Sequence, residues 1–329
     1  MRDGLAKHGG VEAVHGVSRP RALFFGTPDI AVPSLDALVE LAEVVFVVCQ
    51  PDKPVGRHQV LTAPPVKVRA TALGLPLEQP VKLRTGEFGA KVKAANADFA
   101  VVIAYGRILP SDVLEGPRLG CLNLHASILP KYRGAAPIQW AIAQGETETG
   151  ITLMKMDAGL DTGPMLETWT LSIGEDETAG ELAPRLGELA ARAVREGIPR
   201  FLRGELEEKK QDDAAATLAP ILTKDHGTID WTKPARSVHA HVRGMNPWPL
   251  GQTSLRGKRV LVHRTTLVQG ATSTAAPGTV ILADKSRVVI ACGAGALELT
   301  QVQLEGKKPM RGADWFLGRG VAEGDVLGR

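Results

Sequence analysis

The sequence predicts a doubly wound α/β domain with a mostly parallel sheet, followed by a smaller β-rich domain. In the first two thirds of the chain, apolar runs rich in β-branched residues alternate with helical segments, and such runs are typical of strands buried on both faces. After residue 203 comes a polar, charged segment without apolar periodicity, which is typical of a linker. Beyond it, short β-rich stretches separated by Gly and Pro turns predict a small β-barrel or sandwich.

The elements of the first domain follow from these runs in chain order. The first apolar run ends at Gly26, and Pro33 is suited to the first turn of the helix that follows. Strands are expected at 22–25, 44–50, 99–106 and 121–130. Helices are expected at 34–43, 66–73, 87–95 and 179–203. The order βαβαβ at the start of the chain is the pattern of a doubly wound sheet.

The chain of 329 residues has room for two domains of ~150 residues each. We expect a disordered leader at 1–20, a first domain at 21–203, a linker at 204–217 and a second domain at 218–329. The leader lacks the apolar core of a secretory signal, and no run approaches the ~18 apolar residues that a membrane span requires. The sequence therefore predicts a cytoplasmic protein that does not bind membranes.

The charge is distributed unevenly between the two parts of the chain. Residues 1–217 hold 24 Lys and Arg against 28 Asp and Glu, a net charge of −4, whereas residues 218–329 hold 15 against 8, a net charge of +7. A basic domain joined to an acidic one is typical of an enzyme that handles nucleic acid, because neutralised phosphates supply much of such binding. The alternative is an ordinary solvated basic surface.

Several other classes of site lack their sequence patterns. Cys49, Cys121 and Cys292 are widely spaced and lie in apolar stretches, which indicates reduced core thiols. The histidines have no HExxH or paired ligand spacing, so we expect no structural metal. No GxGxxG follows the first strand and no GxxxxGK[ST] occurs, so neither a nicotinamide cofactor nor a nucleoside triphosphate is favoured.

Asn123 and His125 are the most informative polar residues. They stand two positions apart on a predicted strand, so both side chains emerge on one face near its carboxyl end, where open parallel sheets bind ligands. An amide donor beside an imidazole is suited to stabilise a developing oxyanion and to move a proton. The loop MDAGLDTGPM adds Asp157 and Asp161, one of which is expected to orient the imidazole. The alternatives are a buried Asn and His satisfied by backbone groups, and Asp side chains that cap turns.

The chain resembles the methionyl-tRNA formyltransferase family over about residues 21 to 325. The resemblance rests on the runs FGTPD, QPDKPVGR, APPVKV, VIAYGRILP, GCLNLHASILPKYRGAAPIQWAI, ETGITLMKMDAGLDTGPM, IDW and NPWP, in that order. It implies transfer of the formyl group of 10-formyltetrahydrofolate to the α-amino group of methionine on initiator tRNA, without a metal. It also implies a Rossmann-like formyltransferase catalytic domain at 21–203 and a tRNA-binding barrel of the OB type at 218–329, with tetrahydrofolate as the other partner and no DNA.

The resemblance also implies roles for individual residues. Asn123, His125 and Asp161 match the catalytic trio, with Asp161 orienting His125 and stabilising its charged form. The expected folate-binding residues are Tyr105, Gly106, Arg107, Ile108, Leu109, Ser127, Ile128, Leu129, Pro130 and Asp157. The expected tRNA-binding residues are Lys53, Arg57, Lys131, Arg133, Lys224, Lys258, Arg259, Lys307 and Lys308. For Lys53, a solvated loop charge is the alternative.

Two other readings remain open. Other 10-formyltetrahydrofolate-dependent formyltransferases and hydrolases share the trio, although a free-standing purine enzyme would lack the basic third of the chain, and a sugar-modifying enzyme is often fused to a dehydrogenase. A non-catalytic RNA-binding protein on the same scaffold is the alternative from another class. The loss of a trio member would indicate it, and all three are present.

Overall fold

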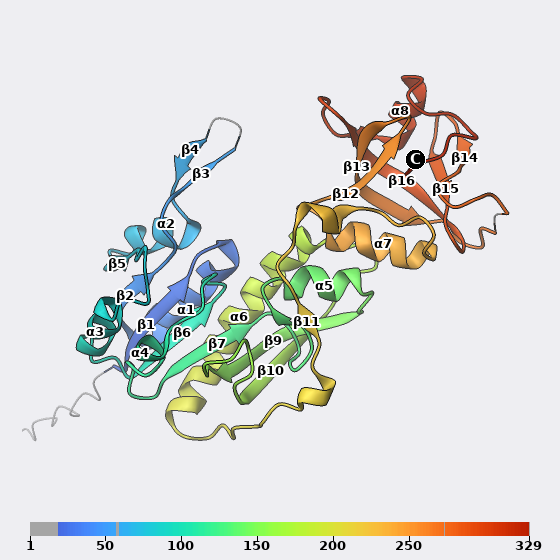
Figure 1. Cartoon of the computed structure of the whole chain (residues 1–329). Helices are drawn as coiled ribbons and strands as arrows, with labels where there is room; N and C mark the ends of the chain where they lie inside the picture. Colours follow the sequence, from blue (N-terminus) through green and yellow to red (C-terminus); the bar gives the residue numbers. More distant parts are fainter. Residues whose placement is uncertain (1–18, 57–58, 273, 329) are drawn as a thin grey trace, which may run out of the picture.

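The computed structural model describes residues 19–56, 59–272 and 274–328. Most of the predicted leader and Arg57 lie outside these residues. The first part of the chain forms a seven-stranded sheet in the order β10-β9-β7-β6-β1-β2-β5 (Figure 1). The strands are β1 (Arg21–Gly26), β2 (Glu43–Val48), β5 (Leu77–Glu78), β6 (Phe99–Ile103), β7 (Cys121–His125), β9 (Glu148–Lys155) and β10 (Met165–Ser172). The five strands from β7 to β5 are parallel, and β9 and β10 extend the sheet antiparallel, which confirms a mostly parallel sheet.

Helices cover both faces of this sheet, as a doubly wound fold requires. Alternate residues of β1 divide between two cores: Ala22 and Phe24 pack with the helices α1 and α6, whereas Leu23 and Phe25 pack on the opposite face with α3 and α4. The helices of this part are α1 (Val32–Leu41), α2 (Pro65–Ala72), α3 (Glu87–Ala94), α4 (Ser111–Leu114), α5 (Pro137–Ala143) and α6 (Ala179–Leu202). Limits were predicted for four of these helices, α1, α2, α3 and α6, and each of the four begins and ends within two residues of its predicted limits.

Two strands end earlier than the sequence predicts. The strand expected at 99–106 stops at Ile103, because Ala104 has a φ of 46° and turns the backbone out of the extended conformation. The strand expected at 121–130 stops at His125. Both early ends lie at the carboxyl edge of the sheet. The chain winds from β1 to β2 on one side and returns to β6 on the other, so the topological switch point lies between β1 and β6 at this same edge.

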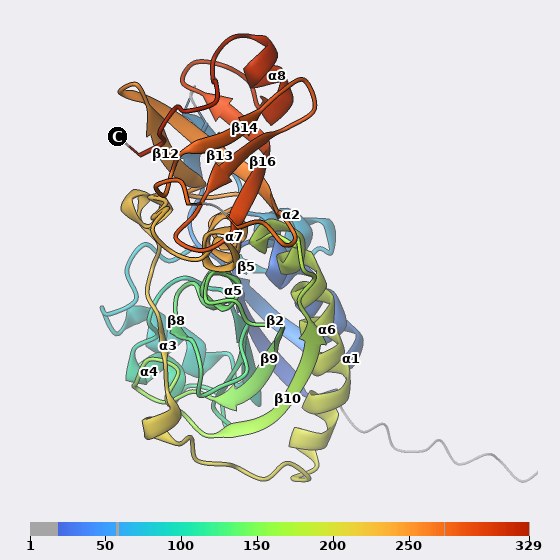
Figure 2. The same ribbon diagram turned by 90° about the vertical axis from the view of Figure 1, so that its right-hand side faces the viewer.

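The connector between the two parts, residues 204–217, has no helix longer than three residues, but it stays in contact with the α/β part. Figures 1 and 2 show it running from the far end of α6 back along the whole α/β part to the C-terminal domain. At its end, β11 (Leu218–Ala219) pairs in parallel with β8 (Arg133–Gly134), which lies in the loop after β7. The connector therefore contacts the segment that follows His125.

The C-terminal part contains the short strands that the sequence predicts, and they pair antiparallel. Its sheet has the order β12-β13-β16-β15-β14, with β17 paired to β16. These strands are β12 (Gly251–Leu255), β13 (Lys258–Leu267), β14 (Val280–Ala283), β15 (Val288–Ala291), β16 (Ala296–Leu304) and β17 (Met310–Arg311). The end of the chain closes the sheet into a barrel, because Leu327 N donates to the Gly278 carbonyl and Gly328 N donates to the Ser254 carbonyl, each at 2.9 Å. The helix α8 (Gly312–Leu317) packs on this barrel.

The helix α7 (Ala235–Gly244) joins the barrel to the α/β part. A Cβ at Gly244 would lie 2.6 Å from the Gln139 carbonyl oxygen of α5, so the two helices approach closely. On the neighbouring side, Glu181 at the start of α6 accepts from Thr178 N and pairs with Arg264 of β13. These bonds lower the pKa of Glu181 to about 2, so it stays ionised at the contact.

The three thiols are buried and free, as predicted. Burial raises the pKa of Cys49 to about 11 and those of Cys121 and Cys292 to about 12, so all three remain protonated near neutral pH. Within the described ranges, no helix has both the length and the apolar character needed to cross a membrane.

Candidate active site

The strand β7 delivers two polar side chains to the carboxyl edge of the sheet. Leu122 and Leu124 pack in the core under α1 and α6, so the period of two directs Asn123 and His125 to the other face, as the sequence predicts. The residues Asn123 and His125 are only 9% and 5% exposed. Buried polar groups at a strand end require partners, and these come from two loops.

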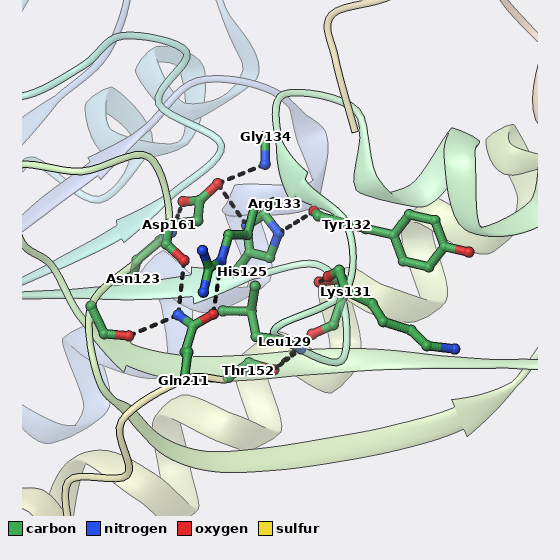
Figure 3. A network of polar contacts seen from close by, with 12 residues as sticks. Asn123, His125, Leu129, Lys131, Tyr132, Arg133, Gly134, Thr152, Asp161 and Gln211 are labelled. Atoms are coloured by element: carbon green, nitrogen blue, oxygen red, sulfur yellow. Dashed lines mark hydrogen bonds and ion pairs between the residues drawn. The ribbon is translucent and has the colours of Figure 1, made fainter. Parts of the chain in front are cut away.

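The first loop carries Asp161, whose carboxylate lies between three donors (Figure 3). Asn123 Nδ2 donates to Oδ1 at 3.3 Å, the Gly134 N–H donates to Oδ2 at 2.9 Å, and His125 Nδ1 lies 3.6 Å from Oδ2. Asp161 has a φ of 53°, a conformation that costs free energy for a residue other than glycine and is often found at functional sites. The structure therefore brings together the three residues expected to be catalytic.

The second loop follows β7 and fixes the other imidazole nitrogen. His125 Nε2 lies 2.8 Å from the Tyr132 carbonyl oxygen, which can only accept, so Nε2 carries a proton. In the neutral ring Nδ1 is then unprotonated, and in the charged ring Nδ1–H faces Asp161. Proton exchange at this site is thus confined to Nδ1.

The loop after β7 is itself held from both sides. The Thr152 hydroxyl of β9 donates to the Ser127 carbonyl at 2.7 Å and accepts from Leu129 N at 3.2 Å. Thr217 Oγ1 of the connector accepts from Tyr132 N at 2.9 Å. Thr152 and Thr217 were not predicted from the sequence, since no pattern separates them from other Thr residues in strands and loops.

Gln211 is a third residue that sequence reasoning missed. It lies in the segment predicted to be a polar linker, yet it is only 3% exposed. Its amide nitrogen donates to the carbonyls of Asp161 and Gly163, both at 2.8 Å, and its oxygen accepts from Arg133 Nε at 3.0 Å (Figure 3). A single Gln in a charged segment gives no periodic signal, so only the folded chain identifies it.

The residues expected to bind folate lie on two segments at the same edge of the sheet. In the loop after β6, Gly106, Arg107 and Ile108 are exposed, while Leu109 is buried in the core beneath α3 and α4. The Tyr105 ring is also in that core, with its centroid 5.5 Å from that of Phe25, so only its backbone borders this edge. Burial raises the pKa of Tyr105 to about 12, and the phenol stays neutral.

The second folate-binding segment directly follows His125. The Ser127 and Leu129 side chains are buried, and Ile128 and Pro130 are partly exposed. Ser127 Oγ donates to the Lys131 carbonyl at 2.6 Å. Asp157 caps a turn, because its Oδ1 accepts from Gly159 N at 3.0 Å and from the Thr162 hydroxyl at 2.7 Å. This is the alternative that the sequence left open for Asp157.

The residues expected to bind tRNA fall into separate groups. Lys53 is exposed in the hairpin formed by β3 (Lys53–Val55) and β4 (Val60–Thr62). Lys258, Arg259, Lys307 and Lys308 are exposed at one end of the barrel, because Val260 pairs with Leu304 and brings the two turns together. Lys224 lies near the other end, since its carbonyl accepts from Gln252 at the start of β12. Lys131 pairs with Glu146 at 3.0 Å.

Arg133, which is also among the residues expected to bind tRNA, is buried in the structure. Its side chain is 9% exposed and its guanidinium binds Gln211 Oε1 and Asp213 Oδ1 at 3.0 and 2.9 Å. A guanidinium buried against two partners positions protein groups instead of offering charge to a solvated polyanion. In the part of the chain that the structure describes, no cluster of three or more His, Cys, Asp or Glu side chains has the arrangement of a metal site.

Comparisons with known proteins agree with this architecture. A family model described as formyl transferase matches residues 21–198, and one described as formyl transferase, C-terminal domain, matches residues 221–320. The methionyl-tRNA formyltransferase of Sorangium cellulosum is 57% identical over 310 residues, covering 94% of this chain and all of that protein. That of Myxococcus xanthus is 49% identical and covers 94% of this chain and 98% of that protein.

A solved structure supports the fold at a greater distance. HypX from Aquifex aeolicus in complex with tetrahydrofolic acid has a TM-score of 0.62 and 19% identity, covering 92% of this chain and 48% of that chain. The close relatives are matched over nearly their whole length by both parts of this chain, the α/β part and the barrel. The chain therefore belongs to the formyltransferase family and, within it, to the methionyl-tRNA formyltransferases.

Proposed function

We propose that Asn123, His125 and Asp161 carry out the reaction of this enzyme, the transfer of a formyl group from 10-formyltetrahydrofolate to the α-amino group of methionine on initiator methionyl-tRNA. The product is formylmethionyl-tRNA for translation initiation. The observation that supports these residues best is the position of the Asp161 carboxylate, between Asn123 Nδ2 and His125 Nδ1 at the carboxyl edge of the sheet. A cytoplasmic location accords with a tRNA substrate.

The residues at this edge fit a formyl donor with a flat apolar ring system. Ile108 and Leu160 are 63% and 56% exposed, and they lie on the loop after β6 and on the Asp161 loop. Exposed apolar side chains on loops beside a topological switch point favour a small-molecule site. We place the pterin between these loops, against Gly106, Arg107 and the segment from Ser127 to Pro130.

The formyl donor supplies an activated carbonyl carbon bound to a nitrogen that can leave. The Asn123 amide has two hydrogens, and Asp161 accepts one of them through a long 3.3 Å contact. The second is suited to donate to the formyl oxygen, where negative charge develops when the methionine amine attacks. A donor fixed before the reaction stabilises such charge more effectively than water.

His125 moves the proton through Nδ1, because Nε2 is bonded to the Tyr132 carbonyl. In its charged form the ring carries the transferred proton on Nδ1, and the Asp161 carboxylate, 3.6 Å away, stabilises the imidazolium until this proton passes to the departing nitrogen. The attacking amine loses one proton and the departing nitrogen gains one, so a single relay through Nδ1 balances the reaction. A metal is not needed for these steps.

We assign the catalytic domain to residues 21–203, the connector to residues 204–217, and tRNA binding to the domain at 218–329. None of Lys258, Arg259, Lys307 and Lys308 has an ion-pair partner among the described residues, so their charges are available to phosphates. The exposed hairpin β3–β4 follows β2 at the sheet edge that carries His125, and this position favours contact of Lys53 with the acceptor end of the tRNA.

Alanine at both Lys307 and Lys308 is expected to raise the KM for methionyl-tRNA several-fold and leave kcat unchanged. Each lost phosphate contact should also reduce the slope of log KM against log salt by about 1. Lys233→Ala is the matched control, since Lys233 is exposed beside Ala294 at the opposite end of β16. The slope is obtained from steady-state kinetics at salt concentrations from about 50 to about 200 mM. An unchanged slope in the double variant would remove this end of the barrel from the tRNA site.

The activity itself is tested by formylation with 10-formyltetrahydrofolate as donor and three parallel acceptors: initiator methionyl-tRNA, elongator methionyl-tRNA and free methionine. We expect rapid formylation of the initiator alone. Consumption of the donor without transfer to any acceptor would indicate a hydrolase. An untouched donor would overturn the proposal and favour another acceptor or a binding protein.

A further inference from the structure

Gln211 lies where the connector between the two domains passes beside the Asp161 loop. The side chain is 3% exposed and reaches the loop from a segment fifty residues further along the chain. Its amide nitrogen donates to the carbonyls of Asp161 and Gly163, which flank Thr162. It therefore holds the backbone on both sides of one loop residue.

Both polar atoms of this amide have protein partners. Both Nε2 hydrogens go to loop carbonyls at 2.8 Å, and Oε1 accepts from Arg133 Nε at 3.0 Å. Arg133 in turn is tied to the connector by its own N–H, which donates to the Thr217 carbonyl at 2.8 Å. A buried network in which every member is satisfied is rigid and depends on the residue type at each position.

The Asp161 carboxylate depends on the backbone that Gln211 holds. Asp161 has a φ of 53°, which a non-glycine residue keeps only where its surroundings impose it. The Asp161 carbonyl is one of the two oxygens bound by Gln211, and the carboxylate of the same residue faces His125 Nδ1 at 3.6 Å. A change at Gln211 is thus transmitted through one residue to the imidazole.

We propose that Gln211 is a positioning residue that fixes the Asp161 loop for catalysis, so that the connector supplies part of the active site. The proposal rests on the proposed roles of Asp161 and His125. Gln211 does not face the reacting groups, and its effect passes entirely through the Asp161 loop. Removal of its two donor hydrogens should lower turnover more than substrate affinity.

Gln211→Glu tests this with little change in volume. The carboxylate still accepts from Arg133, but it cannot donate to the two carbonyls. We expect kcat to fall by ~30-fold, while KM for methionyl-tRNA and for the formyl donor changes by less than ~3-fold, because two hydrogen bonds are lost away from the bound substrates. Gln211→Met, which has similar length and no charge, should show a comparable loss and decides the question if the glutamate variant does not fold. Glu207→Gln is the matched control: it makes the reverse replacement, Glu to Gln, at an exposed position of the same segment, and it should behave as wild type.

Two further measurements separate positioning from general stability. In an Asp161→Asn background, Gln211→Glu should cause little additional loss of kcat, because its effect passes through Asp161. Hydrogen exchange should rise in a peptide covering residues 157–163 and remain unchanged in α6. This second measurement needs no substrate, so it stands even if the proposed reaction fails. Wild-type kcat in both Gln211 variants, equal losses with and without Asp161, or unchanged loop exchange would each overturn the proposal.

Discussion

Replacement of His125 by alanine is expected to lower turnover by ~100-fold or more while both substrates still bind. Its Nδ1 is the imidazole nitrogen that faces the Asp161 carboxylate, because Nε2 is held by the Tyr132 carbonyl. Without the imidazole, no other described side chain is in position to carry the proton. The Asn123 amide keeps its place on β7, so part of the charge stabilisation should survive and the residual rate should exceed that of the uncatalysed reaction.

Asp161→Asn is expected to cause a loss of similar size for a different reason. The Gly134 N–H and the Asn123 amide both donate to the carboxylate, one to each oxygen. An asparagine places an NH₂ group opposite one of these donors, so one hydrogen bond is replaced by a contact between two donors. The charge that stabilises the imidazolium is also removed.

Single-turnover formylation and equilibrium binding of the folate should be measured for both variants. The predicted result is a slow chemical step with donor affinity close to that of the wild type. Near-normal turnover in either variant would remove that residue from the mechanism. A loss of donor affinity equal to the loss of turnover would place the residue in the folate site instead.

The face of β7 that carries Asn123 and His125 could be predicted from the sequence because it depends on a local period. The alternation with Leu122 and Leu124 fixes which side chains share a face, and the apolar runs fix the parallel strands around them. The carboxyl edge then follows from the handed winding of βαβ units. These are properties of short segments and of chain direction.

The parts of the site that could not be predicted come from contacts between distant segments. From the sequence, Arg133 is expected to be a cation of a basic loop. In the structure its guanidinium is buried against Gln211 and Asp213, about eighty residues further along the chain. Tyr105 and Asp157 have residue types suited to a binding loop, yet the ring of one enters the core and the carboxylate of the other caps a turn. Burial of a polar side chain by a non-local partner leaves no periodic signal in either segment.

Gly134→Ala is the other substitution with a large expected effect, and it should lower both stability and activity. Gly134 has a φ of 129°, and a Cβ there would lie 2.6 Å from the Ala219 carbonyl oxygen of β11. The clash is with backbone, so the β8–β11 pair must open and the connector must shift. Together the strain and the clash should lower the free energy of unfolding by about 3 kcal/mol.

The same substitution disturbs the Asp161 carboxylate, because the Gly134 N–H donates to Asp161 Oδ2 at 2.9 Å. Displacing this donor weakens a charge-assisted hydrogen bond, so turnover should fall by ~100-fold even at temperatures where the variant is folded. Gly145→Ala is the matched control: its φ is 81°, but nothing lies within 4 Å of the added Cβ, so it carries the backbone strain without the clash. Chemical denaturation and formylation assays on both variants separate the effect of backbone strain from the effect of the clash. If Gly145→Ala and Gly134→Ala lose the same stability and activity, backbone strain alone explains the effect, and the contact between the connector and the loop after β7 has no part in catalysis.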